Sequence, residues 1–279
     1  MPYVTVGEEN GHDIDIYYED HGSGGQPIVM IHGYPLDGRS WEKQQRELLP
    51  AEYRVIAYDR RGFGKSSQPT VGYDYDTYVD DLDALIRHLD LDELVLCGFS
   101  MGSGEVVRYL GKYGSARVDK AVLMGAIPPA LLQSDDNPEG VPGEVFEQIK
   151  AAVIADRPAY FKDFLDNFYN VDRLGGTRIS EQAWQASFIA AVTASPYAAH
   201  AAVDSWLTDF RGDVAKIDVP VLLIHGDEDR ILPYASTAAR LPALIRDLTF
   251  VTVEGGPHNI AWTHPDIVNP ALMEFLAKK

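Results

Sequence analysis

The sequence predicts an α/β fold built on a mainly parallel sheet. Seven short apolar runs are predicted strands, and most of them lack polar alternation, as strands buried on both faces do. From the third run onward, amphipathic helical patterns separate the runs, with apolar residues three and four apart. Strands that alternate with helices in this order form parallel sheets. A chain of 279 residues is long enough to bury a large core of this class.

The elements follow one another along the whole chain. The predicted strands are residues 14–18, 28–31, 54–58, 94–99, 118–124, 221–224 and 248–253. Because a turn joins the first two runs, we expect the sheet to open with an antiparallel hairpin or meander. The predicted helices between and after the strands are residues 40–49, 75–89, 103–113, 235–244 and 265–278.

Almost a hundred residues separate the strand at 118–124 from the strand at 221–224, far more than one helical crossover needs. The predicted helices of this insertion are residues 144–155, 159–170, 181–194 and 197–210, with Ser195 as N-cap and Pro196 at the first helical position. We therefore predict a core in two parts, 1–127 and 214–279, and a helical cap at 128–213. Such a cap would lie above the ends of the strands and enclose a pocket.

The stretch Gly98-Phe99-Ser100-Met101-Gly102 stands between a predicted strand and a predicted helix. Two glycines let the backbone turn sharply around the serine and raise its hydroxyl above the sheet edge. This context is that of a nucleophile elbow, so Ser100 is the predicted nucleophile. A chance match of glycines around a surface serine would not supply both the strand and the helix.

A serine hydroxyl needs a histidine base and a carboxylate that orients it, and in hydrolases of this topology the chain order is Ser, acid, His. Asp229 follows the strand at 221–224 and is the predicted acid. Asp227 is expected to brace the loop and Glu228 to face solvent. His258 follows the next strand in a glycine-rich loop and is the predicted base.

The other histidines have more ordinary expected roles. His264 begins a predicted helix and is expected to cap or pack, while His32 and His225 lie at strand ends and are expected to form hydrogen bonds within loops. No strand end brings the remaining four to Ser100: His12, His21, His88 and His200.

Two backbone N–H groups are expected to stabilise the negative oxygen of a tetrahedral intermediate. Met101 follows the nucleophile at a helix N-terminus, where the partial positive charge also favours an anion. The second donor is expected in the turn His32-Gly33-Tyr34-Pro35. The Tyr34 N–H is the candidate there, because Pro35 has no N–H.

Composition excludes several classes of partner. Asp and Glu outnumber Lys and Arg by 42 to 24, and the net charge of −18 disfavours nucleic acid and anionic membranes.

The lone Cys97 lies in an apolar strand and is predicted to be a buried structural thiol. Without a signal peptide or membrane span, we expect a cytoplasmic protein. No metal-binding motif is present, and the loop 59–67 lacks the first glycine of a nucleotide-binding loop, where Asp59 stands instead.

These motifs together resemble the α/β-hydrolase fold over essentially the whole chain: His32-Gly33, residues 59–66, 98–102 and 225–233, and His258. Within that superfamily, residues 32–38, 58–64 and 98–102, with Pro257-His258 and Trp262-Thr263-His264, resemble the cofactor-free bacterial haloperoxidases. Relatives of these enzymes are esterases, perhydrolases and γ-lactamases. The resemblance implies an eight-stranded, mostly parallel sheet with a helical cap.

The resemblance also implies a Ser100/His258/Asp229 triad that forms an acyl-enzyme on small esters, carboxylic acids or lactams. Water or hydrogen peroxide then resolves the acyl-enzyme, and peroxide gives a peracid that oxidises halide without haem, vanadium or any other cofactor. Proline after the oxyanion aromatic residue is typical of strong perhydrolases, and Pro35 fits that pattern. Tyr34, Pro35 and Phe99 are the expected substrate-binding residues.

Two alternatives remain open. One is a plain carboxylesterase or γ-lactamase with negligible peroxidase activity. The other is a receptor that keeps the hydrolase scaffold and closes its cap on a ligand. The oligomeric state is also open, a homo-oligomer included.

Overall fold

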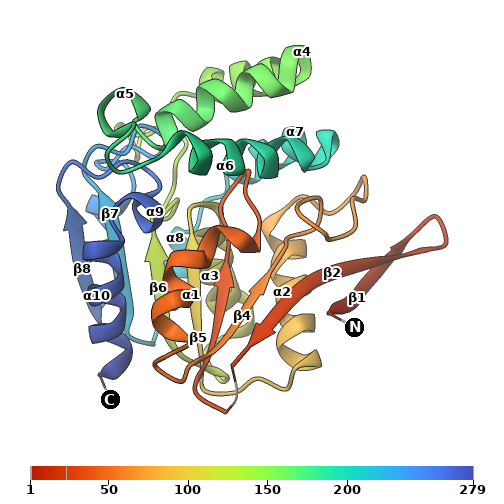
Figure 1. The fold of residues 1–279 in the computed structure, drawn as a ribbon, viewed down its shortest axis with the longest axis vertical. Coiled ribbons are helices and arrows are strands. Elements are labelled where there is room, and N and C mark those ends of the chain that lie inside the picture. Colours follow the sequence, from red (N-terminus) through yellow and green to blue (C-terminus); the bar gives the residue numbers. More distant parts are fainter. Residues whose placement is uncertain (1, 23, 279) are drawn as a thin grey trace.

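The computed structural model describes residues 2–22 and 24–278. In this part of the chain an eight-stranded sheet has the order β1-β2-β4-β3-β5-β6-β7-β8, with helices on both faces, so the predicted fold class is confirmed (Figure 1). Its strands are β1 (Tyr3–Glu9), β2 (His12–His21), β3 (Pro27–Ile31), β4 (Arg54–Tyr58), β5 (Leu94–Phe99), β6 (Val118–Met124), β7 (Val221–Gly226) and β8 (Leu248–Val253).

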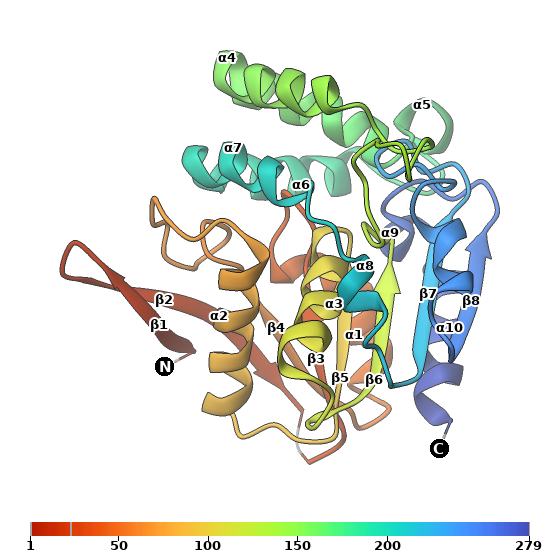
Figure 2. The ribbon, with the colours of Figure 1, turned by 180° about the vertical axis from the view of Figure 1, so that it is seen from behind.

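The helices of the core are α1 (Glu42–Leu48), α2 (Tyr75–His88), α3 (Met101–Tyr113), α8 (Arg211–Val214), α9 (Ile260–Thr263) and α10 (Pro265–Ala277), with the 3-10 helices η1 (Gly38–Trp41) and η2 (Ala238–Ala243). Helices α1 and α10 cover one face of the sheet, seen in front in Figure 1, and α2, α3 and α8 cover the other, seen in front in Figure 2. This sandwich buries the strands from both sides: every residue of β5 and β7 is buried.

The sheet opens with an antiparallel hairpin, as expected, but β1 and β2 form it and not the first two predicted strands. Strand β2 pairs antiparallel with β1 and with β4, and not with β3. The sequence patterns do not predict β1, in which only Val4 is buried, so that this strand buries little apolar surface. From β4 to β8 each neighbouring pair is parallel, as the alternation of strands and helices predicted.

Four helices of the insertion lie above the carboxyl ends of the parallel strands: α4 (Gly143–Phe168), α5 (Val171–Leu174), α6 (Glu181–Thr193) and α7 (Pro196–Ser205) (Figures 1 and 2). Its last helix, α8, packs beside α3 in the core. Helix α4 joins the two helices predicted at 144–155 and 159–170 across a break at Asp156. Ser195 caps α7 by accepting the Ala198 N–H, as predicted. The boundaries of the cap at residues 128 and 213 stay a prediction.

Two predicted helices differ from the structure. Residues 235–244 form only the short 3-10 helix η2, because Pro242 cannot donate a backbone hydrogen bond inside an α-helix. The helix predicted at 197–210 ends at Ser205, and α8 begins at Arg211.

No single helix in the described residues is both long and apolar enough to cross a membrane; only α6 and α7 taken together pass such a test, and they meet at a 93° bend.

Candidate active site

Ser100 occupies the tight turn between β5 and α3 in a strained conformation, with φ 54° and ψ −118°. The flanking glycines make this turn possible. A Cβ on Gly98 would lie 2.3 Å from the Gly102 carbonyl oxygen, and a Cβ on Gly102 would lie 2.2 Å from the Ile31 carbonyl oxygen. The Ser100 N–H donates to the Met124 carbonyl at 2.8 Å and so fastens the turn to the end of β6.

The structure places His258 between Ser100 and Asp229. Its Nε2 lies 2.8 Å from Ser100 Oγ, and its Nδ1 lies 2.6 Å from Asp229 Oδ2. The three residues follow β5, β7 and β8, so the parallel sheet brings together side chains that are 158 and 29 positions apart in the sequence. The imidazole is fully buried, with the rings of Phe99 and Phe168 each 5.0 Å away.

Asp229 is held as a carboxylate by several donors. Its Oδ1 accepts the N–H groups of Ile231 and Leu232, both at 2.8 Å. Burial alone would raise the pKa of Asp229, but the positive charge available on His258 and the hydrogen bonds from His225 and His258 lower that pKa well below its usual range. An ionised acid at this position orients His258 and stabilises its imidazolium form.

His225 also reaches the candidate triad. Its Nδ1 accepts the Ala126 N–H at 3.2 Å, which assigns the ring proton to Nε2, and Nε2 lies 3.3 Å from Asp229 Oδ2. Only hydrogen bonds within the loop were expected for His225, so its contact with Asp229 is an additional finding. The spacing of four residues between His225 and Asp229 was the available signal.

The remaining candidates among the acids and histidines lie outside this cluster. Asp227 braces the loop through the Gly255 N–H at 2.7 Å, as expected. Glu228 is partly exposed and forms an ion pair with Arg173, rather than simply facing solvent. His264 contacts Thr263 Oγ1 at 2.9 Å beside the start of α10.

The two expected oxyanion donors lie at either side of Ser100. Met101 is the first residue of α3, where N–H groups have no partner within the helix. The loop carrying Tyr34 packs against the elbow, since a Cβ on Gly33 would lie 2.8 Å from the Cβ of Ser100. In the described residues neither N–H takes part in a turn, loop or capping hydrogen bond.

The Tyr34 side chain contacts the cap. Its hydroxyl donates to the Ala199 carbonyl at 2.9 Å, and its ring lies against Trp206, with centroids 4.8 Å apart. Pro35 is buried and follows Tyr34 through a cis peptide bond. Phe99 is buried against His258.

An apolar cavity of about 300 Å³ lies between the cap and the loop after β7. Trp206 lines it and contacts Tyr34, while Ile231 and Leu232 line it and bind Asp229 through their N–H groups. The cavity therefore shares its inner wall with the site. Most of the other lining residues are apolar side chains of the cap and its entry loop: Leu131, Val141, Val145, Phe146, Ile149 and Phe164.

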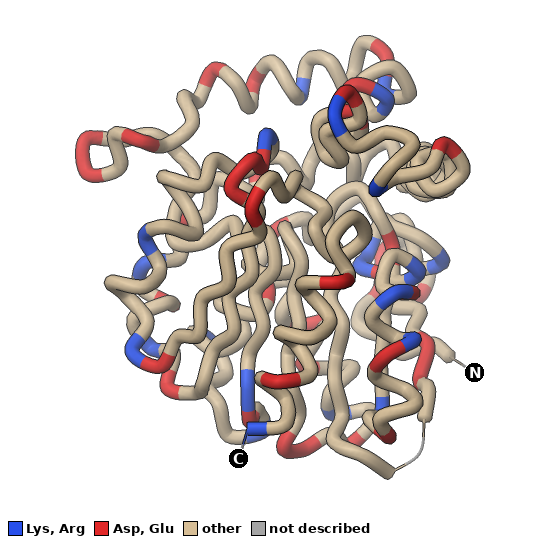
Figure 3. The backbone as a smooth tube through the Cα atoms, turned by 60° about the vertical axis from the view of Figure 1, so that its left-hand side comes forward, with Lys and Arg blue, Asp and Glu red and all other residues tan. Residues whose placement is uncertain are grey.

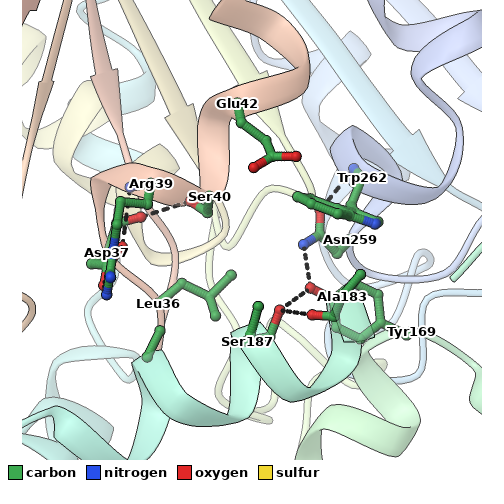
Figure 4. Close-up of a pocket in the computed structure, with 12 residues that line it drawn as sticks. Leu36, Asp37, Arg39, Ser40, Glu42, Tyr169, Ala183, Ser187, Asn259 and Trp262 are labelled. Carbon is green, nitrogen blue, oxygen red and sulfur yellow. Dashed lines mark hydrogen bonds and ion pairs between the residues drawn. The ribbon is translucent and has the colours of Figure 1, made fainter. Parts of the chain in front are cut away.

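A second cavity, of about 210 Å³, lies between the loop after β3, helix α6 and α9 (Figure 4). Several of its polar side chains bind one another: Tyr169 bonds to Ser187 at 2.7 Å, and Asn259 Nδ2 donates to Tyr169 at 3.2 Å. Asn259 adjoins His258 in the sequence. Among the described residues no group of three or more His, Cys, Asp or Glu side chains could hold a metal ion.

Comparison with known proteins gives consistent matches. The family model described as alpha/beta hydrolase fold matches residues 26–265. A protein of Synechocystis sp. named "Putative non-heme chloroperoxidase" is 62% identical over 99% of this chain and 100% of its own length. A bifunctional esterase/perhydrolase of Acinetobacter calcoaceticus is 33% identical over 99% of both chains. The crystal structure of bromoperoxidase from Bacillus anthracis is 42% identical, with a TM-score of 0.94 over 99% of both chains. This chain therefore belongs to the α/β-hydrolase fold family and, within it, to the enzymes that include the non-haem haloperoxidases.

Proposed function

We propose that this enzyme is a serine hydrolase that transfers an acyl group from a small ester, carboxylic acid or lactam to water or to hydrogen peroxide. The observation that carries the proposal is the continuous chain of hydrogen bonds from Asp229 through His258 to Ser100. Such a chain lets a serine act as a nucleophile at neutral pH.

In the acylation step, Ser100 Oγ attacks the substrate carbonyl carbon while His258 Nε2 takes the hydroxyl proton. The carbonyl oxygen becomes negative and accepts the N–H groups of Tyr34 and Met101, which are already oriented before the reaction. The bond to the leaving group then breaks, and His258 returns the proton to the departing oxygen or nitrogen. The acyl group remains on Ser100 as an ester.

In the second step, water or hydrogen peroxide attacks the acyl carbon and gives up a proton to His258. The bond from that carbon to Ser100 Oγ then breaks, and His258 returns the proton to the serine oxygen, which restores the free enzyme. Water releases a carboxylic acid, and hydrogen peroxide releases a peracid. The peracid then oxidises a halide ion in solution to hypohalous acid and becomes the carboxylic acid again. The names of the relatives, chloroperoxidase and esterase/perhydrolase, support both outcomes.

The apolar cavity beside Trp206 supports a substrate with a hydrocarbon acyl or alcohol group. Burial of such a group contributes roughly 25 cal/mol for each Å² of apolar surface removed from water. We therefore expect esters with an aliphatic or aromatic group to be better substrates than highly polar ones.

The test is the variant Ser100→Ala with Ser180→Ala as its matched control, since Ser180 only caps α6. We expect Ser100→Ala to lose ester hydrolysis, the burst of acyl-enzyme on a chromogenic ester, and halide oxidation with acetate and peroxide. The control should retain all three. Halide oxidation that survives Ser100→Ala would contradict the peracid route, and wild-type protein that binds esters without a burst would contradict the acyl-enzyme and favour a receptor.

A further inference from the structure

A buried ion pair lies beneath the oxyanion loop. Arg60 follows β4 and Glu105 lies in α3, and their side chains are 1% and 0% exposed. The guanidinium Nε and Nη2 both contact Glu105 Oε1, and the Tyr58 hydroxyl donates to the other carboxylate oxygen. Both charges are thus enclosed by protein.

Arg60 binds the oxyanion loop directly. Its Nη2 donates to the His32 carbonyl at 2.7 Å, and its backbone N–H donates to His32 Nε2 at 3.0 Å. The His32 ring in turn donates through Nδ1 to the Gly33 carbonyl at 2.9 Å. The loop that ends at Tyr34 is therefore fixed through its carbonyl groups. In the described part of the chain, the Tyr34 N–H has no hydrogen-bond partner.

Glu105 belongs to the helix whose first residue is Met101. Residues four apart lie on the same face of a helix, so the carboxylate that Arg60 binds lies one turn from the second oxyanion donor. The Phe63 ring packs between the two parts of this assembly, 5.9 Å from the Arg60 guanidinium and 6.0 Å from the Tyr34 ring.

A purely stabilising role explains this arrangement poorly. The cost of removing two charges from water offsets most of their attraction, so an apolar pair of similar volume would hold the helix to the loop at least as well. An apolar pair could not bind the His32 carbonyl, however, and it would leave the direction of the peptide groups on that loop less defined.

We propose that Arg60 and Glu105 are positioning residues that hold the oxyanion loop and the first turn of α3 at the separation needed for Tyr34 N–H and Met101 N–H to bind one oxygen. The proposal rests on the acyl-enzyme function above. Neither residue touches the substrate. Their contribution is to the geometry of the transition state and not to the binding of the ground-state ester.

A neighbouring ion pair provides a matched control. Arg61 binds Asp81 through two contacts of 2.6 Å, and the two side chains are 5% and 4% exposed. This pair joins the loop after β4 to α2, and the Arg61 side chain also donates to the Val71 carbonyl. Like the first pair it is charged and buried, but in the described hydrogen bonds it does not bind the residues around Ser100.

The experiment compares two double variants that remove both charges of a pair: Arg60→Met with Glu105→Gln, and Arg61→Met with Asp81→Asn. For the first we expect kcat on a chromogenic ester to fall about 10- to 100-fold, the size of effect that a displaced oxyanion donor has, with KM nearly unchanged. Binding of a boronic acid that forms a tetrahedral adduct with Ser100 should weaken by a similar factor. The second double variant should keep kcat and boronic acid affinity.

The variant Arg60→Lys provides an independent measurement if the first double variant does not fold. Lysine keeps the positive charge but has one ammonium group in place of the planar fork, so it cannot bind Glu105 and the His32 carbonyl in the same geometry. We expect a reduced kcat for this variant as well. A full kcat in any folded variant of Arg60 and Glu105, or an equal loss in the Arg61 and Asp81 variant, would overturn the proposal. A surviving acyl-enzyme burst in Ser100→Ala would instead overturn the function on which it rests.

Discussion

At the scale of single residues, the unusual feature of this site is how firmly Asp229 is held. Two backbone N–H groups bind one carboxylate oxygen, while His258 and His225 bind the other. Each donor fixes the direction in which the carboxylate presents its oxygen to His258. The orientation of His258, the proposed base, thus depends on His225. Among the described residues, the His225 ring contacts Ala126, Leu232 and Asp229, and it has no hydrogen bond with Ser100.

The change His225→Phe tests this dependence. Phenylalanine keeps the ring packing on Tyr234, whose centroid is 6.0 Å away, but removes the N–H directed at Asp229. We expect kcat for ester hydrolysis to fall about 10-fold with little change in KM, since orientation of a general base is worth part of the 10²- to 10⁴-fold that such catalysis supplies. Steady-state kinetics on a chromogenic ester measure both constants.

His264→Phe is the control for this change, because the His264 ring is also buried and contacts Thr263 Oγ1 beside α10. The backbone hydrogen bonds of His264, to Ile260, Ile267 and Val268, do not depend on its side chain. Its kcat should match that of the wild type. Equal losses in the two variants would show that the His225 effect is one of general packing.

Sequence reasoning could anticipate the meeting of Ser100, Asp229 and His258 because each follows a predicted parallel strand, and parallel strands end at one edge of the sheet. It could not anticipate the contacts of Arg60 with Glu105, which are 45 positions apart and depend on how α3 packs under the loop after β3. It missed the role of His225 because a side chain at a strand end can bind the loop, the acid or both. The three-dimensional structure distinguishes these three possibilities for His225.

At the scale of elements, the junction of β3 with α3 determines the geometry around Ser100. The first turn of α3 packs so closely on the end of β3 that only glycine fits at position 102, where a Cβ would lie 2.2 Å from the Ile31 oxygen and 2.8 Å from the Ile31 carbonyl carbon. Both are backbone atoms, so neither can move aside by a change of rotamer. A larger residue must displace the helix from the strand.

The substitution Gly102→Ala should therefore destabilise the protein by about 1–3 kcal/mol, the usual cost of overpacking, and should also lower kcat because the Met101 N–H moves with the helix. Thermal unfolding and ester kinetics measure the two effects. Gly212→Ala in α8 is the control, because a Cβ there meets no heavy atom within 4 Å. It should retain stability and kcat, and unchanged values in Gly102→Ala would contradict the packing described here.

The elements that sequence patterns predicted well are those buried on both faces, such as β5 and β7, and amphipathic helices such as α2. The misses have local physical reasons. Strand β1 buries little apolar surface, although the β-branched run Val4-Thr5-Val6 was a usable signal. The pairing of β2 with β4 joins segments far apart in the sequence, so no local pattern predicts it. Pro242 limits η2 to a 3-10 helix.

At the scale of the whole molecule, acid stability depends on how many protons the folded and unfolded chains bind. Asp and Glu outnumber Lys and Arg by 42 to 24, and the positions of both kinds are spread along the core and the cap (Figure 3). Two buried groups have a more specific effect on acid stability. Burial and the nearby charge of Arg60 lower the pKa of His32 to about 3. Burial raises the pKa of Asp59 to about 6, despite hydrogen bonds from the Lys65 and Gly38 N–H groups.

His32 and Asp59 have opposite effects on the stability of the folded chain as the pH falls. As the pH falls below 6.5, the ordinary value for histidine, His32 takes up a proton in the unfolded chain but not in the folded one, so acid reduces stability. Asp59 takes up a proton in the folded chain near pH 6 but in the unfolded chain only near 3.8, so acid increases stability in that window. The two contributions therefore offset each other between pH 6 and 3.8.

Replacing one of these two groups should reveal the contribution of the other to the pH dependence of stability. As the pH decreases from about 6 to about 4, we expect the unfolding free energy of Asp59→Asn to fall relative to wild type by about 1.4 kcal/mol for each pH unit. That of His32→Gln should rise by a similar amount over the same decrease in pH. Urea unfolding at several pH values gives these slopes, and surface carboxylates cancel because every variant keeps them. In the double variant His32→Gln with Asp59→Asn, the unfolding free energy should change with pH as it does in wild type, since both opposing contributions are then absent. Single variants that also run parallel to wild type would mean that neither group has a shifted pKa, and that the acid response of this molecule arises elsewhere.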